Sequence, residues 1–126
     1  MILGIGTDIV DVGRIERSMS RNPRLGEKLF TEAERAYCEG RASRYQSYAA
    51  RFAAKEAVMK AIGTGWDGYI NWQDIEVCSD ALGKPGIICH NAVRSFMEEH
   101  HVREIHISLS HEKTHAIAYV ILETKD

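Results

Sequence analysis

One glutamate in the middle of the chain stands among cations. Glu56 has Lys55 beside it and Lys60 four residues later, and Arg51 and Arg44 precede it. A carboxylate can ligate a metal ion while nearby cations hold an anion such as a phosphate. The spacing of Glu56 and Lys60 is equally that of an ordinary helical surface pair, which contributes roughly 0.2–0.5 kcal/mol. Both interpretations stay open at this point.

Asp8 is the second carboxylate that could serve such a site. It falls on one face of an expected strand, together with Gly4, Gly6 and Val10, because side chains alternate along a strand. Burying a carboxylate there is costly unless a cation or hydrogen-bond donors satisfy it. Mg²⁺ takes one or two protein carboxylates and completes its shell with water and substrate phosphates, so Asp8 and Glu56 would suffice if they meet.

The segment His111-Glu112-Lys113-Thr114-His115 formally matches the H-E-x-x-H zinc-protease motif. That motif functions on a helix, where residues four apart point the same way. Here it lies between two segments of alternating polarity, which predicts a hairpin turn and argues against a protease. His111 could instead meet a ligand phosphate, or be a solvated turn histidine.

Gly83-Lys84-Pro85 predicts a tight turn from which Lys84 projects. It is not a P-loop, because the G-x-x-x-x-G-K-[ST] spacing is missing. No G-x-G-x-x-G opens a helix, and no G-x-S-x-G is present. The common nucleotide-binding folds and the serine hydrolases with a nucleophile elbow are therefore not expected.

A cationic stripe occupies one side of an expected helix near the N-terminus. Arg14, Arg17 and Arg21 share that side, and Arg24 follows the helix. The opposite side is apolar and consists of Val12, Ile15 and Met19. Such a stripe suits docking of an acidic helical protein, although it could also serve only solubility.

Composition predicts one domain spanning residues 1–126, because 44% hydrophobic residues can supply one core at this length. The net charge of −2 gives no reason to expect nucleic-acid binding. The charge is uneven, however: residues 14–60 carry eleven Lys and Arg against six Asp and Glu. This basic region indicates an anionic ligand or partner, or else an ordinary solvated helical surface.

The chain lacks a long apolar run and a charged-then-apolar leader, so we expect no membrane span and no secretion, and a cytoplasmic protein. The chain has an odd number of cysteines, Cys38, Cys78 and Cys89, and it contains no C-x-x-C motif. This pattern argues against a disulfide framework and a thiolate zinc site, and favours small buried side chains.

The N-terminal half predicts one strand followed by helices. Residues 2–12 favour a strand, after which Asp11 can cap a helix that stops before Pro23. Thr31 begins a capping box for a short helix that Gly40 can close. An alanine-rich helix is expected over residues 43–62, ended by Gly63 and Gly65. Five small side chains form one narrow arc on it and would allow a close neighbour: Ala50, Ala53, Ala54, Ala57 and Ala61.

The C-terminal half predicts two hairpins separated by a helix. Residues 74–78 and 87–89 are expected to be strands around the Lys84 turn, and residues 91–101 a helix with Val93, Phe96 and Met97 inward. Residues 104–109 and 116–122 alternate and should pair as the second hairpin. The order strand, helices, hairpin, helix, hairpin defines an α+β fold rather than regular βαβ repetition.

Three separated motifs together resemble one family along almost the whole chain, from residue 2 to about residue 122. They are Gly4-Ile5-Gly6-Thr7-Asp8-Ile9-Val10, then Phe52-Ala53-Ala54-Lys55-Glu56 with Lys60 and Gly63-Thr64-Gly65, and finally Leu82-Gly83-Lys84-Pro85. The sequence is similar to the bacterial holo-acyl-carrier-protein synthases, the short phosphopantetheinyl transferases. The resemblance implies a long alanine-rich helix packed on a mainly antiparallel sheet.

The resemblance also implies an activity: transfer of phosphopantetheine from coenzyme A to a serine of apo acyl carrier protein in fatty acid biosynthesis, with Mg²⁺, releasing adenosine bisphosphate. A non-catalytic module that binds coenzyme A or an acidic protein is the alternative. The family forms homotrimers with sites between subunits, so Asp8 and His111 are expected on a different subunit from Glu56 and Lys60.

Carried over by residue, the family pattern makes Asp8 and Glu56 the metal ligands. It makes Glu56 and Lys60 catalytic, with Lys60 at the coenzyme's phosphates. The coenzyme-binding turns would supply Lys84, Pro85 and His111. The carrier protein would dock on Arg14, Arg21 and Arg24.

Overall fold

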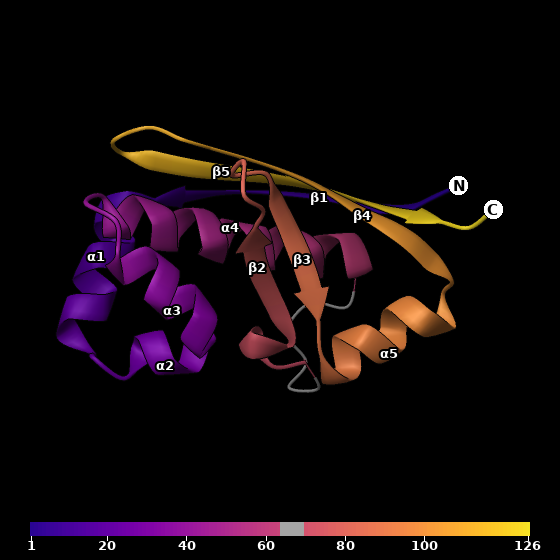
Figure 1. Cartoon of the computed structure of the whole chain (residues 1–126), viewed down its shortest axis with the longest axis horizontal. Helices are drawn as coiled ribbons and strands as arrows, with labels where there is room; N and C mark the ends of the chain where they lie inside the picture. Colours follow the sequence, from indigo (N-terminus) through magenta and orange to yellow (C-terminus); the bar gives the residue numbers. More distant parts are fainter. Residues whose placement is uncertain (64–69) are drawn as a thin grey trace.

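A computed structural model describes residues 1–63 and 70–126 of the chain. The elements follow one another as β1 (Ile2–Asp11), α1 (Val12–Arg21), α2 (Leu25–Leu29), α3 (Glu32–Glu39), α4 (Arg44–Ile62), the short 3₁₀ helix η1 (Trp72–Asp74), β2 (Ile75–Ser79), β3 (Pro85–Cys89), α5 (Asn91–Glu99), β4 (Val102–His111) and β5 (His115–Thr124). This order confirms the α+β expectation (Figure 1).

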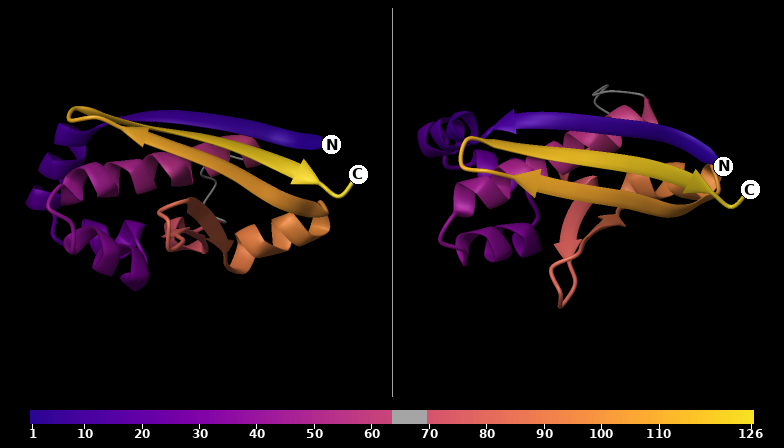
Figure 2. Two further views of the ribbon diagram at one scale, coloured as in Figure 1. Left: turned by 45° about the horizontal axis from the view of Figure 1, so that its top comes forward. Right: turned by 90° about the horizontal axis from the view of Figure 1, so that it is seen from above.

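An antiparallel sheet in the order β1-β5-β4 forms one layer of the molecule. Asp8 pairs with Ala118, and His111 pairs with Ala116 at the end of the β4–β5 hairpin. The hairpin β2–β3 forms a second, smaller sheet. Both chain ends lie at the same end of the large sheet (Figures 1 and 2), where Thr124 N donates to Met1 O at 2.7 Å.

Helix α4 runs beneath the large sheet (Figure 2). Its alanine arc is buried, as the periodicity predicted: Ala50, Ala53, Ala54, Ala57 and Ala61. Strand β1 places Gly4 and Gly6 against this arc. A Cβ at Gly4 would collide with the Ala61 carbonyl, and one at Gly6 with the Ala57 carbonyl. Small residues on both sides therefore bring the two backbones into contact and place Asp8 beside α4.

The predicted helix caps are confirmed where the structure describes them. Asp11 accepts a hydrogen bond from Arg14 N at 2.9 Å at the start of α1. Thr31 and Glu34 form the reciprocal capping box of α3. Gly63 ends α4 with a φ of 89°, a left-handed conformation that glycine adopts without strain. Gly65, the second expected end signal, lies outside the described residues.

The structure differs from the sequence expectations at α2 and at the end of α5, among other places. Helix α2 was not expected, because a five-residue helix without a side-chain cap leaves no periodic signal. Gln73, which lies far along the chain, stabilises the end of α2, because its side-chain nitrogen donates to the carbonyl of the C-cap residue Phe30 at 3.1 Å. Helix α5 ends at Glu99 rather than residue 101, and His101 has a φ of 56°.

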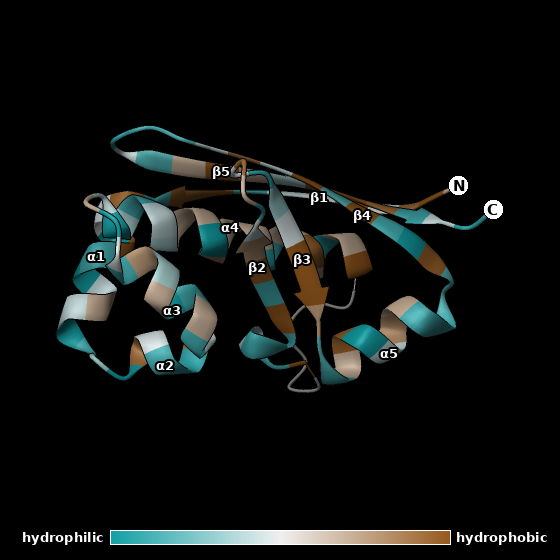
Figure 3. Ribbon diagram, viewed as in Figure 1, coloured by the Kyte–Doolittle hydropathy of each residue, from teal (hydrophilic) through white to brown (hydrophobic). Residues whose placement is uncertain are grey.

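Large apolar side chains of β1 and β5 are exposed on the outer face of the large sheet. Ile5 is 69% exposed, Ile9 64% and Tyr119 57%. Figure 3 shows hydrophobic residues along β1 and hydrophilic ones at the β4–β5 turn. Among the described helices, none combines the length and apolar character that crossing a membrane requires.

Candidate active site

Lys60 connects α4 to the first strand. Its Nζ lies 3.1 Å from Asp8 Oδ1 and donates to the Thr7 carbonyl at 2.9 Å. The Asp8 side chain is 17% exposed, whereas that of Lys60 is 55% exposed. Asp8 and Lys60 thus meet within one chain, so Asp8 need not come from another subunit than Lys60.

Glu56 lines the same cavity as Asp8, and the charge of Asp8 affects its pKa. Burial raises the pKa of Glu56, the negative charge of Asp8 raises it further, and Lys60 opposes both effects. The expected surface pair between Glu56 and Lys60 is not formed among the described residues, since Lys60 turns to Asp8 instead. Two carboxylates that repel each other across a shared space offer oxygen ligands to a divalent cation.

Both carboxylates line a cavity of about 370 Å³, which we call the carboxylate cavity. Phe52 and Trp72 form part of its wall, with ring centroids 5.0 Å apart and planes 25° apart. Arg14 also lines it, which brings the first residue of the arginine stripe next to the carboxylates. Arg17, Arg21 and Arg24 are exposed.

A second cavity, of about 300 Å³, lies elsewhere and shares no lining residue with the first. We call it the arginine cavity. Arg51 is 4% exposed, and its guanidinium carbon lies 3.9 Å from the ring centre of Tyr37. Arg41 approaches the same ring at 5.2 Å. Arg51 Nε is buried without a hydrogen-bond partner, and no carboxylate of the described residues pairs with either guanidinium. Positive charge that has an aromatic ring but no carboxylate beside it favours an anionic ligand.

The predicted coenzyme-binding turns surround this second cavity. His111 and Pro85 both line it, with Ser79 and Gly83. Asp80 shapes the turn, because its Oδ1 accepts from Lys84 N at 2.9 Å. Gly83 has a φ of 86°, which suits glycine.

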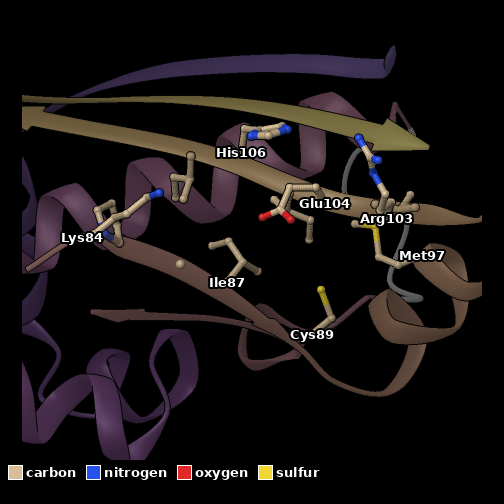
Figure 4. Close-up of a pocket in the computed structure, with 12 residues that line it drawn as sticks. Lys84, Ile87, Cys89, Met97, Arg103, Glu104 and His106 are labelled. Carbon is tan, nitrogen blue, oxygen red and sulfur yellow. The ribbon is translucent and has the colours of Figure 1, made fainter. Parts of the chain in front are cut away.

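Lys84 itself lines a neighbouring cleft of about 500 Å³ between β3 and β4. Figure 4 shows Lys84 at one end of this cleft and Met97 at the other. Pro85 lines both the cleft and the arginine cavity. The structure therefore places His111 and Pro85 together, with Lys84 next to them and not in the same space.

The H-E-x-x-H segment is a turn, as expected, and not a helix. His111 ends β4 and His115 begins β5. Glu112 stabilises the turn by accepting hydrogen bonds from Thr114 N and His115 N, both at 2.9 Å. Among residues 1–63 and 70–126, no three His, Cys, Asp or Glu side chains are grouped so that they could hold a metal ion.

Two of the cations around Glu56 do not serve the carboxylates. Lys55 is fully buried and pairs with Glu34 at 2.8 Å. Arg44 pairs with Glu39 at 3.2 Å on the surface. The interpretation that all four cations surround one anion is therefore wrong. Residues that are close in the sequence of one helix can point to different neighbours, and the sequence does not reveal which.

The sequence prediction missed the cluster of Arg41, Arg51 and Tyr37. In the sequence Arg51 stands close to Glu56, but the two line different cavities on different sides of α4. An arginine between the small residues of a buried helix must be compensated, and this was the signal available in the sequence. Its aromatic partner, Tyr37, lies on α3, and no pattern in the sequence indicates that the two residues meet.

The three cysteines are free. Cys38 is buried, as predicted, and burial raises its pKa to about 12. Cys78 and Cys89 are only partly buried, and burial raises the pKa of Cys89 to about 11. Neither shifted thiol is suited to act as a nucleophile near neutral pH.

Comparison with known proteins adds independent information. Residues 4–120 match the 4'-phosphopantetheinyl transferase superfamily. The holo-[acyl-carrier-protein] synthase of Moorella thermoacetica is 48% identical over 123 residues, which cover 98% of this chain and 95% of that protein.

Solved structures agree with this match. The holo-[acyl-carrier-protein] synthase of Neisseria meningitidis superposes with a TM-score of 0.90 at 35% identity, covering 98% of this chain and all of that one. The enzyme of Bacillus anthracis in complex with CoA (3',5'-ADP) gives a TM-score of 0.82 at 38% identity, covering 99% of each chain.

Proposed function

The chain belongs to the 4'-phosphopantetheinyl transferase superfamily, and from that premise we propose how its two cavities serve one reaction. The protein is an enzyme that transfers phosphopantetheine from coenzyme A to a serine of apo acyl carrier protein. The observation that carries the proposed site is the meeting of Asp8, Glu56 and Lys60 where β1 contacts α4.

The carboxylate cavity fits Mg²⁺. Asp8 and Glu56 supply oxygen ligands, and their mutual repulsion would be relieved by a divalent cation. Two carboxylates leave room for water and for the phosphate oxygens of a substrate, which is how Mg²⁺ is usually held. When bound, the ion would offset charge on the pyrophosphate of coenzyme A.

The side chains of the site then have distinct roles. Glu56 takes the proton of the carrier serine as the general base. The serine oxygen forms a bond to the β-phosphorus while the phosphoanhydride bond breaks and adenosine 3',5'-bisphosphate leaves. Lys60 offsets the charge that develops on the phosphate oxygens.

The arginine cavity would hold the adenosine bisphosphate end of the coenzyme. Arg51 and Arg41 offer unpaired positive charge, and His111, Pro85 and Lys84 lie around or next to the cavity. The Bacillus anthracis relative has CoA (3',5'-ADP) in its structure, which supports a coenzyme site on this fold.

The carrier protein would dock on α1. Arg14 lines the carboxylate cavity, and Arg21 and Arg24 are exposed further along the same side of the molecule's N-terminal region. A row of cations leading to the carboxylates would guide an acidic carrier and its serine to the site.

A homotrimer would join the two cavities. Within one chain they lie on different sides of α4, so one coenzyme could use the arginine cavity of one subunit and the carboxylate cavity of the next. The exposed apolar face of the large sheet offers the contact surface. We further propose a cytoplasmic location, since three free thiols fit a reducing compartment.

The activity is tested by measuring the mass of the carrier protein. Incubation with apo carrier protein, coenzyme A and Mg²⁺ should add one phosphopantetheine to the carrier, as seen by mass spectrometry. The alternative, a non-catalytic module that holds coenzyme A or an acidic protein, predicts binding without any mass gain across several apo carriers.

The role of Glu56 is tested by Glu56→Gln. We expect turnover to fall ~10²–10⁴-fold, because the base is lost, and the Mg²⁺ requirement to rise. Glu99→Gln, on the exposed surface of α5, is the control and should leave the rate unchanged. A Glu56→Gln enzyme with the parent rate at limiting Mg²⁺ would exclude this role.

A further inference from the structure

A buried ion pair joins α3 to α4 at the centre of the molecule. Lys55 Nζ lies 2.8 Å from Glu34 Oε1, and both side chains are completely buried. Neither residue lines the carboxylate cavity or the arginine cavity. Burying two charges costs more free energy than an apolar pair of the same size, so stability alone gives a weak reason for this arrangement.

Both members of the pair are also hydrogen-bonded to the backbone. Lys55 Nζ donates to Glu34 and to the carbonyl groups of Trp72, at 3.0 Å, and Ile75. These bonds use all three donors of the ammonium group. Glu34 accepts from Thr31 N and from Val77 N, both at 2.8 Å. One pair thus fixes α3, α4, η1 and β2 relative to one another.

One arm of this network leads to the carboxylate cavity. Lys55 holds the backbone of Trp72, whose ring stacks on Phe52, and both rings line the cavity with Asp8 and Glu56. Phe52 and Glu56 are one turn apart on α4. The distance between this aromatic wall and the carboxylates therefore depends on where Lys55 holds η1.

The other arm leads to the arginine cavity. Glu34 holds Val77 N in β2, two residues before Ser79, which lines that cavity. Ser79 pairs with Pro85 across the β2–β3 hairpin, and Pro85 lines the cavity too. The position of this hairpin against Arg51 on α4 therefore depends on Glu34.

We infer that Glu34 and Lys55 are positioning residues that hold the two cavities in fixed relation to α4. The inference rests on the proposed function, because it assigns the cavities to one reaction. Neither side chain touches a substrate; both act through Trp72 and β2. A displacement of about 1 Å at a reacting site costs up to roughly 10²-fold in rate, so a loosened wall reduces turnover without unfolding the protein.

The test must separate positioning from stability. Lys55→Met alone leaves the Glu34 charge buried and unpaired, and is expected to destabilise the fold. The double variant Glu34→Gln/Lys55→Met removes both charges and keeps an acceptor for Val77 N. The control is Glu98→Gln/Arg94→Met, which removes both charges in the same way from an ion pair whose side chains are 69% and 70% exposed.

Two readouts are measured below the melting temperature of each protein. The first is kcat at saturating coenzyme A and carrier, where we expect a ~10–100-fold loss for the buried double variant and none for the control. The second is iodide quenching of Trp72 in a Trp66→Phe background, which leaves one tryptophan. Quenching should rise in the buried double variant, because the wall of the carboxylate cavity is released.

Each outcome decides the question. A lower kcat with greater quenching of Trp72 in a folded protein supports positioning. A parent-like kcat overturns it, whatever the melting temperature, and so does a lower kcat with unchanged Trp72 quenching. If the parent itself transfers no phosphopantetheine, the proposed function fails, and the quenching comparison alone then decides whether the pair holds η1.

Discussion

At the level of single residues, Glu56 shows how the fold changes side-chain chemistry. Burial and the charge of Asp8 raise its pKa, so the metal-free folded protein holds the Glu56 proton more strongly than the unfolded chain does. The unfolded chain has the ordinary glutamate pKa. Ionised Glu56 thus destabilises the metal-free protein: the cost is absent below the unfolded pKa, grows between the two pKa values, and is fully present above the raised folded pKa.

Glu56→Gln should therefore raise the melting temperature of the metal-free protein at pH 7.5. We expect an increase of roughly 1–4 °C, because the buried charge is removed. The difference should shrink as the pH falls through the ordinary glutamate pKa and disappear near about pH 3, where glutamate is protonated in both states. Thermal unfolding in a chelating buffer measures it; a parent that is more stable than the variant at pH 7.5 would contradict the raised pKa.

Addition of Mg²⁺ provides the matching control for this experiment. The ion stabilises only the state that binds it, so it should raise the melting temperature of the parent more than that of Glu56→Gln. Equal stabilisation of both proteins would mean that Glu56 is not a ligand.

At the level of elements, the contact of β1 with α4 sets the geometry of the site. Gly4 and Gly6 allow the strand to touch the helix backbone, and Asp8 follows two residues later on the same face. The helix presents Glu56 and Lys60 at that point. The glycines of the first motif thus matter because a side chain would separate the carboxylates.

Gly6→Ala tests this contact. We expect a loss of about 1–3 kcal/mol or more in the free energy of unfolding, since the new Cβ meets the Ala57 carbonyl and backbone must move. Turnover should fall as well, because Asp8 is displaced. Gly40→Ala is the control: its Cβ would meet only ordinary contacts, with 3.5 Å to the nearest atom, and should change stability by less than about 0.5 kcal/mol. Urea unfolding distinguishes the two.

The arginines near α1 make a separate prediction. Changing Arg21 and Arg24 together to Glu should slow association with the carrier protein and flatten its dependence on salt, because electrostatic steering is lost and neither residue lines the carboxylate cavity. Coenzyme binding should be unaffected. Stopped-flow association and calorimetry measure the two; an equal loss in both would indicate misfolding rather than docking.

At the level of the whole molecule, the apolar outer sheet face and the separation of the two cavities both favour assembly. Changing Ile5 and Tyr119 together to Lys should convert the proposed homotrimer to monomers in light scattering, because charges would be buried at the contact. Turnover should fall with it. Leu82→Lys is the control, as Leu82 is 95% exposed on the β2–β3 turn, away from this face. A monomeric parent would refute the assembly.

Mixed assemblies test whether neighbouring subunits share a site. Glu56→Gln and His111→Ala should each be nearly inactive alone. When the two proteins are unfolded, mixed and refolded together, some sites combine an intact Glu56 from one subunit with an intact His111 from another, and activity should return. A mixture no more active than its parts would place both residues in the same chain's site.

Local signals in the sequence were enough to predict most elements. The caps at Asp11 and Thr31, the glycine at position 63 and the alternation of β4 and β5 all act over a few residues, so they are readable without a fold. The same holds for the turn between His111 and His115, whose flanking strands ruled out a zinc protease. Helix α2 escaped prediction because its support comes from Gln73, far along the chain.

The sequence alone also determined the family resemblance and the identity of Asp8, Glu56 and Lys60 as site candidates. Only the tertiary structure decided which charges meet: Lys60 pairs with Asp8, Lys55 is buried on Glu34, and Arg51 lies at Tyr37 in another cavity. The physical reason is that periodicity defines the side of a helix on which a residue lies, whereas its partner is brought there by another element. Burial then sets the cost of each charge, and burial exists only in the packed molecule.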